Sequence, residues 1–136
     1  MSLEMSIIIP NRIFLKDTVK EIILPTLTGQ IGILNNHIPL FTGLDVGVIS
    51  IRSESSSTWV TVVVTGGFAL VNNNKITILV NEAEFGTDIN YEEAEKSFNK
   101  AKESLQNFSD NKKKLEFATL YRKAKVRFQV SQKSNK

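Results

Sequence analysis

The sequence contains no cysteine and only one histidine. Without cysteine the chain has no disulfide, no thiolate nucleophile and no cysteine-ligated zinc. The histidine, His37, lies between Asn36 and Ile38, and one imidazole without a cluster of carboxylates beside it makes a poor metal site. We expect a structural or contact role for His37 and no metal site in the chain.

Phosphate-binding and catalytic motifs are lacking as well. No glycine-rich loop ends in Gly-Lys-Ser or Gly-Lys-Thr, and Gly66-Gly67 precedes a predicted strand, so neither fingerprint of a nucleotide-binding loop is present. The glycine pair is better explained by backbone dihedral angles that other residues avoid. The spacing of Glu21 and Asp45 does not bring the two carboxylates together as an acid and a base. We therefore expect no catalytic residue and no cofactor.

Long apolar runs are also lacking. No stretch approaches the roughly 18 apolar residues of a membrane-spanning helix, so any membrane association is expected to depend on a partner. The first residues show neither a secretory signal nor an arginine-rich transit peptide, so we expect the protein to work in the compartment where it is made. The 136 residues suffice for one core and one appended element, and 41% hydrophobic with 23% charged residues is ordinary for a globular protein.

The first part of the chain, up to about residue 85, contains a series of strand patterns. Alternating or continuous apolar stretches predict strands at 3–9, 19–24, 31–34, 46–51, 59–64, 68–71 and 76–80. The strand at 59–64 is β-branched and aromatic throughout, so it is expected to be buried on both faces and to end at Gly66-Gly67. Residues 72–74 are the turn of a predicted hairpin. This regular spacing favours a β-sandwich or barrel.

After Gly86 the apolar period changes from two to about three and a half, which is typical of amphipathic helices. The first apolar stripe comprises Tyr91, Ala94, Phe98, Ala101, Leu105 and Phe108, and the second comprises Phe117, Leu120, Ala124 and Phe128. Asn90 is positioned to cap the first helix, with Glu93 three residues later as in a capping box. A predicted turn at 107–111 makes the helices antiparallel neighbours. Alanines weaken their seam, so we expect a marginal hairpin that is able to pack elsewhere.

Charge is distributed unevenly along the chain. Residues 1–87 carry five Lys/Arg and seven Asp/Glu, residues 88–108 carry three and five, and residues 109–136 carry nine and two, so only the last segment is basic, with a net charge of +7. The basic helix is a solvated face, a nucleic-acid surface or a docking surface for an acidic protein. Nucleic acid is disfavoured because the cations are not interleaved with exposed aromatic residues. Docking is favoured because complementary charge speeds encounter and fixes register.

Five stretches carry a resemblance to a known family. They are EIILP at 21–25, PTLTGQIGILNNHIP at 25–39, TGLDVG at 42–47, GGFA at 66–69 and LYRKAKVR at 120–127. Any one glycine-containing piece is weak, but together the motifs are highly specific and span essentially the whole chain. On these motifs the sequence is identified as a member of the epsilon subunits of F-type ATP synthases, of the plastid and cyanobacterial type.

The resemblance implies a mainly β plus α fold, with a ten-stranded β-sandwich over residues 1–86 and an antiparallel two-helix hairpin over residues 87–136. The sandwich is expected to bind the gamma subunit of the central stalk and the c-ring. The hairpin is expected to inhibit ATP hydrolysis by reaching the catalytic alpha and beta subunits. The chain would then be a non-catalytic rotor subunit of the proton-translocating synthase, without cofactor and without nucleic acid as partner.

The resemblance also implies a location. The subunit is expected to be peripheral, held through the complex at the stromal face of the thylakoid membrane in a plastid (chloroplast). A bacterial inner or thylakoid membrane is the alternative. In either case the contact with the membrane is indirect.

Two groups of site residues follow from the resemblance. The loop that faces the c-ring comprises Gln30, Ile31, Gly32, Ile33, Leu34, Asn35, Asn36 and His37, and the inhibitory contact with the beta subunit comprises Arg122, Lys123, Lys125 and Arg127. Family members often carry a carboxylate at the position of Gln30, so here hydrogen bonds would replace an ion pair to the ring.

Some bacterial members of the family bind ATP through an Ile/Leu-Asp-x-x-Arg pattern at the start of the hairpin. In this sequence Asn90 replaces the aspartate and Glu93 replaces the arginine. An acid at the position of a phosphate-facing cation repels the nucleotide. We therefore predict no ATP-binding site.

A second hypothesis needs no resemblance. The chain would be a free-standing β-sandwich binding module whose basic helical tail contacts nucleic acid or a membrane surface. Salt-dependent retention on DNA or anionic lipid, without affinity for a stalk subunit, would distinguish it from the first hypothesis.

Overall fold

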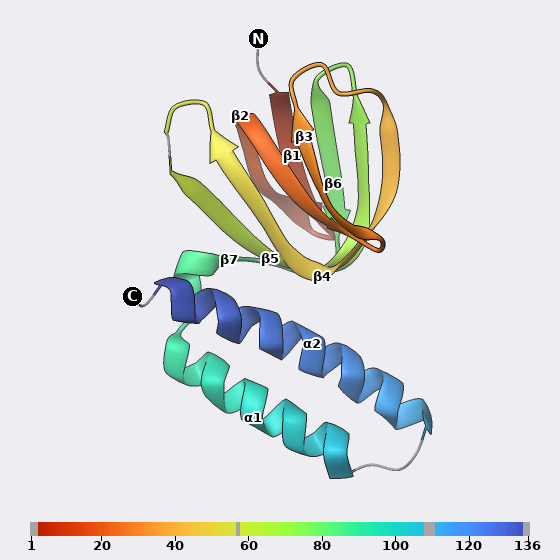
Figure 1. The fold of residues 1–136 in the computed structure, drawn as a ribbon, viewed down its shortest axis with the longest axis vertical. Helices are drawn as coiled ribbons and strands as arrows, with labels where there is room; N and C mark the ends of the chain where they lie inside the picture. The colour runs from red at the N-terminus through yellow and green to blue at the C-terminus, as the bar shows by residue number, and fades with distance from the viewer. Residues whose placement is uncertain (1–2, 57, 108–110, 135–136) are drawn as a thin grey trace. The chain divides into compact units, whose positions relative to one another are not determined.

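The computed structural model describes residues 3–56, 58–107 and 111–134. The chain divides into two compact units, Met1–Glu84 and Phe85–Lys136, and each is described by itself (Figure 1). No helix in the described ranges combines the length and apolar character needed to cross a membrane.

In the chain the strands come first and the helices follow them. They are β1 (Leu3–Ile9), β2 (Arg12–Thr26), β3 (Gly29–Leu34), β4 (Leu40–Ser53), β5 (Trp59–Asn72), β6 (Lys75–Val80), β7 (Ala83–Phe85), the 3-10 helix η1 (Gly86–Asp88), α1 (Tyr91–Asn107) and α2 (Asn111–Ser134). The prediction of a mainly β fold followed by two helices is confirmed.

The strands form one sheet in the order β1-β6-β5-β4-β2-β3, with β7 paired to β5. β1 and β6 run parallel, and the other neighbours in this order run antiparallel. Because β1 also pairs with β2, the sheet closes on itself as a barrel-like sandwich (Figure 1). Its interior is filled by side chains that are fully or almost fully buried, among them Leu3, Met5, Ile7, Ile22, Leu24, Ile49, Val62, Ile76 and Ile78.

The expected number of ten strands is wrong, because the described part of the chain contains seven. The difference arises from the length of β2, β4 and β5, which have 15, 14 and 14 residues. The register between β2 and β4 shifts at two points, and such bulges bend a strand without ending it. A bent strand can contribute to both layers of the sandwich and replace two shorter strands.

The expectation for the strand at 59–64 is also partly wrong. Trp59 is 45% exposed and only the second half, Val62–Val64, is buried. The following glycines do not end the strand, since β5 continues to Asn72. The predicted unusual dihedral angles are confirmed, with φ of 108° at Gly66 and 152° at Gly67. Glycine lets the strand continue here through a conformation that a side chain would disfavour.

The second unit is an α1–α2 hairpin. The predicted cap is confirmed, because the Glu93 N–H donates to Asn90 Oδ1 at 2.9 Å. The seam is richer in rings than the alanine pattern predicted, since Phe98 stacks on both Tyr121 and Phe128 at centroid distances of 5.6 and 5.3 Å, and Tyr91 also contacts Phe128. Most of the predicted turn, residues 108–110, lies outside the described residues.

Gly67→Ala is expected to destabilise the barrel by about 3 kcal/mol. The added Cβ would overlap the backbone of the neighbouring strand, and alanine would be held at a strained φ. A Cβ at this position would meet the Leu79 carbonyl group and would come within 2.9 Å of the Cα of Val80. Urea unfolding of the full chain measures the change.

Gly32→Ala is the matched control, since no atom lies within 4 Å of a Cβ added there. Its free energy of unfolding should change by less than about 1 kcal/mol. Equal unfolding midpoints for the two variants would contradict the close approach of β5 and β6 at Gly67.

Candidate functional site

The stretch expected to face the c-ring is divided by the structure. Residues 30–34 lie on β3, which ends the strand order and pairs with β2, so most of the expected loop is an edge strand. Gln30 and Leu34 are exposed, whereas Ile33 is fully buried in the barrel. Within the stretch expected to face the c-ring, the Ile33 side chain therefore packs inside the barrel and is not at the surface. Asn35–His37 belong to the connection between β3 and β4.

An apolar strip lies on the outer face of the barrel, and we define it by Phe41, Phe68, Leu70 and Leu79. Phe41 pairs with Leu70 across β4 and β5, and Phe68 pairs with Leu79 across β5 and β6, so the four lie on neighbouring strands. Phe41 is 68% exposed and stacks on Phe68 at 5.6 Å with 11° between the rings.

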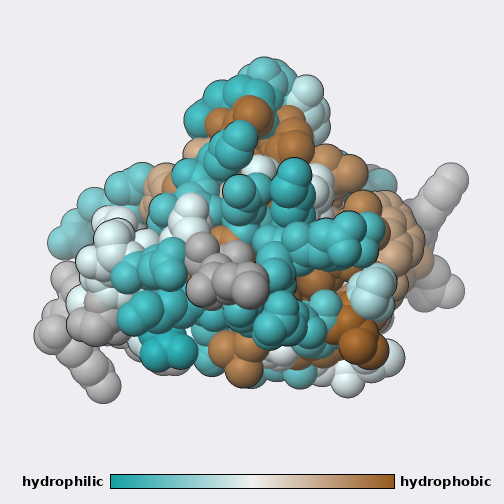
Figure 2. All heavy atoms as spheres, turned by 90° about the horizontal axis from the view of Figure 1, so that it is seen from above, coloured by the Kyte–Doolittle hydropathy of each residue, from teal (hydrophilic) through white to brown (hydrophobic). Residues whose placement is uncertain are grey.

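The apolar strip borders a hollow of about 380 Å³ lined by Ile8, Ile9, Pro10, Gly67, Phe68, Leu79, Val80 and Asn81. Figure 2 shows apolar side chains reaching the surface between polar ones. Sequence reasoning missed the strip. The sequence does contain a signal for it. Residues 68–71 are apolar at every position, and alternate residues of a barrel strand face outward, so some of these apolar side chains must lie on the surface.

The four cations expected to contact a beta subunit differ in exposure. Arg122 and Lys125 are exposed, whereas Lys123 and Arg127 are half-buried. Only 15% of the Arg127 side chain is accessible, because it turns back onto α1. The structure therefore separates two exposed cations from two that are half-buried, of which Arg127 pairs with Glu93 on α1.

Arg127 forms a two-point ion pair with Glu93. Its Nη2 donates to Glu93 Oε2 at 2.9 Å and its Nη1 to Oε1 at 3.3 Å, and Ser97 Oγ also donates to Oε1 at 2.9 Å. The hydrogen bonds from Arg127 and then Ser97 lower the pKa of Glu93 below its ordinary value. The Glu93 carboxylate thus joins the first turn of α1 to α2, where a capping box would have directed it back to Asn90.

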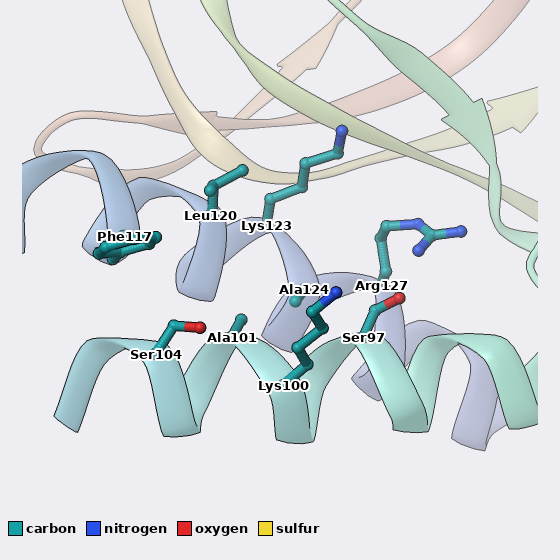
Figure 3. Close-up of a pocket in the computed structure, with 9 residues that line it drawn as sticks. All are labelled: Ser97, Lys100, Ala101, Ser104, Phe117, Leu120, Lys123, Ala124 and Arg127. Carbon is teal, nitrogen blue, oxygen red and sulfur yellow. The ribbon is translucent and has the colours of Figure 1, made fainter. Parts of the chain in front are cut away.

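A cavity of about 350 Å³ lies between the two helices of the hairpin. It is lined by Ser97, Lys100, Ala101, Ser104, Phe117, Leu120, Lys123, Ala124 and Arg127 (Figure 3). The alanines leave this space because they fill less volume than the rings on either side of them. Its polar groups are cations and hydroxyls, and the cation closest to Glu93 is already neutralised by it.

Comparisons with known proteins find similar sequences over nearly the whole chain. The family profile described as "ATP synthase, Delta/Epsilon chain, beta-sandwich domain" matches residues 2–86. A protein of Euglena gracilis named "ATP synthase epsilon chain, chloroplastic" is 56% identical over 132 residues, covering 97% of this chain and 98% of that protein. The chain belongs to the epsilon-chain family of ATP synthases. Epsilon chains of Nephroselmis olivacea and Stigeoclonium helveticum, also named chloroplastic, are 50% and 47% identical over 96% of this chain, covering 97% and 95% of those proteins.

Solved structures extend the similarity to the fold. A chain of the Euglena gracilis mitochondrial ATP synthase, in a structure of OSCP, F1 and c-ring, superposes with a TM-score of 0.83 at 21% identity, covering 92% of this chain and 78% of that one. A chain of the Tetrahymena thermophila mitochondrial ATP synthase, from its central stalk and c-ring, gives 0.70 at 16% identity, covering 96% and 97%. The epsilon-chain fold is therefore shared at low sequence identity. Membership of the family over nearly the full length favours the first hypothesis over a free-standing binding module.

Glu93→Gln is expected to destabilise the hairpin by about 0.5 to 1 kcal/mol, because the pair is more than half open to solvent at Glu93 and is screened there. A double-mutant cycle with Arg127→Gln, read from hydrogen exchange of α1 amides in the full chain, measures the coupling. Since the folded pKa of Glu93 is lowered, the contribution is present above the unfolded pKa and is lost as pH falls through the folded one. Glu92→Gln, one position earlier, is the control and should leave the pH profile unchanged.

The full chain is expected to show no submillimolar binding of Mg-ATP in titration calorimetry. Asn90 and Glu93 both depart from the ATP-binding pattern, and the Glu93 carboxylate occupies the guanidinium of Arg127. Glu93→Gln, which removes the negative charge, is the comparison and should bind no more weakly than the parent chain. A clear submillimolar isotherm for the parent would contradict the prediction.

Proposed function

We propose that the chain is the epsilon subunit of a plastid-type F-type ATP synthase, where its barrel couples the c-ring to the gamma stalk and its hairpin inhibits ATP hydrolysis. One observation carries this division of roles. The barrel exposes an apolar strip on β4, β5 and β6, whereas the hairpin exposes cations on α2. The two units therefore suit partners of different chemistry.

The barrel is suited to a lasting contact with the central stalk. The apolar strip offers stacked, exposed rings of the kind that enrich protein interfaces. The c-ring contact is assigned to the exposed members of the stretch 30–37, which are polar at Gln30 and Asn36. Hydrogen bonds from these amides would suit the polar loops of a ring, and Ile33 supports the strand from inside.

The hairpin is suited to a reversible contact with the alpha and beta subunits. Arg122 and Lys125 are exposed on α2, and complementary charge would bring them to an acidic surface and fix their register. The helix seam combines a cavity with a partly exposed ion pair, which supports a hairpin of modest stability. Such an element can exchange between two packings of similar free energy.

The chain itself is a non-catalytic accessory subunit, and the whole complex performs the chemistry. The curated relatives are named chloroplastic, which supports a plastid location at the thylakoid membrane. The stromal face is part of the proposal. We assign the rotor contacts to residues 1–86 and the regulatory contact to residues 87–136.

The double variant Arg122→Glu/Lys125→Glu is expected to weaken inhibition of ATP hydrolysis, because like charges would then face the acidic surface. Added as the full chain to an epsilon-depleted plastid-type F1, it should raise the half-inhibitory concentration by about tenfold or more, equivalent to about 1.4 kcal/mol. Steady-state ATP hydrolysis at increasing chain concentration measures the effect.

Lys16→Glu/Lys20→Glu is the matched control, since both lysines are exposed on β2 and the net charge changes by the same amount. This variant should inhibit like the parent chain. Unchanged inhibition by the α2 variant, or an equal loss in both variants, would remove the support for a specific contact through α2.

A further inference from the structure

The connection between β3 and β4 has a demanding backbone. Residues 35–39 belong to no strand or helix, and Ile38 within them is 74% exposed. A turn is closed by the His37 N–H, which donates to the Leu34 carbonyl oxygen at 3.2 Å. Asn36 has a φ of 65°, in the left-handed region that residues with a side chain disfavour. The shape of this connection therefore depends on contacts that favour the left-handed residue.

Asn74 supplies such a contact from a distant part of the chain. Its Oδ1 accepts the backbone N–H of Asn36 at 2.7 Å, and its Nδ2 donates to Asn36 Oδ1 at 3.4 Å, across a sequence separation of 38 residues. The first bond is made to the main chain of the connection and so fixes its path. Because a backbone donor is satisfied in this conformation, the bond offsets the cost of the left-handed φ.

Asn74 is itself held rigidly. It is the second residue of the two-residue turn between β5 and β6, where Asn73 and Asn74 have φ of 50° and 61° and Asn72 pairs with Lys75. This is the backbone of a tight hairpin turn, in which asparagine is favoured. The Asn74 carbonyl oxygen also accepts the Glu4 N–H of β1 at 2.9 Å. The anchor is therefore fixed to β1, β5 and β6 at once.

We propose that Asn74 is a positioning residue for docking: its side-chain amide holds residues 35–39 in the shape that presents Asn36 and His37 to the partner. The proposal rests on the proposed function, in which the stretch 30–37 faces the c-ring. Asn74 is not a contact residue in this account. It acts by ordering the connection before binding, which removes part of the entropy cost of docking.

The test compares full-length variants at two neighbouring positions of the same turn. Asn74→Gly removes the side chain while glycine accepts the left-handed backbone, and Asn74→Asp keeps an oxygen that accepts the Asn36 N–H. Asn73→Gly and Asn73→Asp are the matched controls, since Asn73 has the same residue type and a similar φ. Thermal unfolding is expected to remain cooperative in both glycine variants, because each keeps the turn.

Two measurements report the role. Hydrogen exchange of the Asn36 amide, followed by NMR in the isolated chain, should accelerate in Asn74→Gly and not in Asn73→Gly. The chain concentration that half-restores proton-driven ATP synthesis to epsilon-depleted plastid-type ATP synthase in liposomes should rise about fivefold in Asn74→Gly, the loss expected for one ordering hydrogen bond. Asn74→Asp should match Asn73→Asp in both measurements.

Unchanged Asn36 exchange, an unchanged half-restoring concentration or failure of the aspartate to rescue would each overturn the role of Asn74. Gln30→Ala and His37→Ala test the proposed function separately, and each should raise the half-restoring concentration. If both do so while Asn74→Gly behaves like Asn73→Gly, only the positioning role fails. If neither does, the c-ring contact through this stretch fails and the role of Asn74 falls with it.

Discussion

Closure of the sheet by β1 is the constraint on which the barrel depends. β1 pairs with β2 on one side and with β6 on the other, and its inward residues Leu3, Met5 and Ile7 are fully buried. Without it the sheet would be open along β2 and β6, and open edges expose unpaired backbone groups. Closure leaves β3 as an edge and fixes the β5–β6 turn through the Glu4 amide. The c-ring contact is therefore assigned to β3, which closure leaves as an edge, and to the connection that follows β3.

The hairpin, unlike the barrel, is not held by strand pairing but by side chains between its two helices. These are aromatic rings at one end and alanines in the middle. The rings of Phe98 and Phe128 give dense contact, whereas Ala101 and Ala124 leave a cavity. A void forfeits dispersion contacts on its walls, so the seam is weaker than its length suggests. The Glu93–Arg127 pair adds a connection that is directional but partly exposed. This combination is compatible with a helix pair that forms readily and separates at modest cost.

Much of the fold was predictable because it depends on local periods. Three features are determined by residues that lie close together in the sequence: the change of period near Gly86, the cap at Asn90 and the β5–β6 turn. The structure contains each of them. The number of strands was not predictable, because one long strand bent by a bulge has the same apolar pattern in the sequence as two shorter strands. Trp59 shows a related limit: β-branched and aromatic composition indicates a strand but not which of its faces is covered.

The candidate sites were less predictable, because their contacts join residues distant in the sequence. Asn36–Asn74 and Glu93–Arg127 span 38 and 34 positions, and no spacing rule connects them. The two contacts also differ in kind. The first satisfies a neutral backbone donor, so it responds little to salt, whereas the second joins full charges near water and weakens as ions screen it. Ionic strength therefore acts on the hairpin more than on the β3–β4 connection, so the element proposed for regulation responds to its surroundings while the element proposed for coupling keeps its shape.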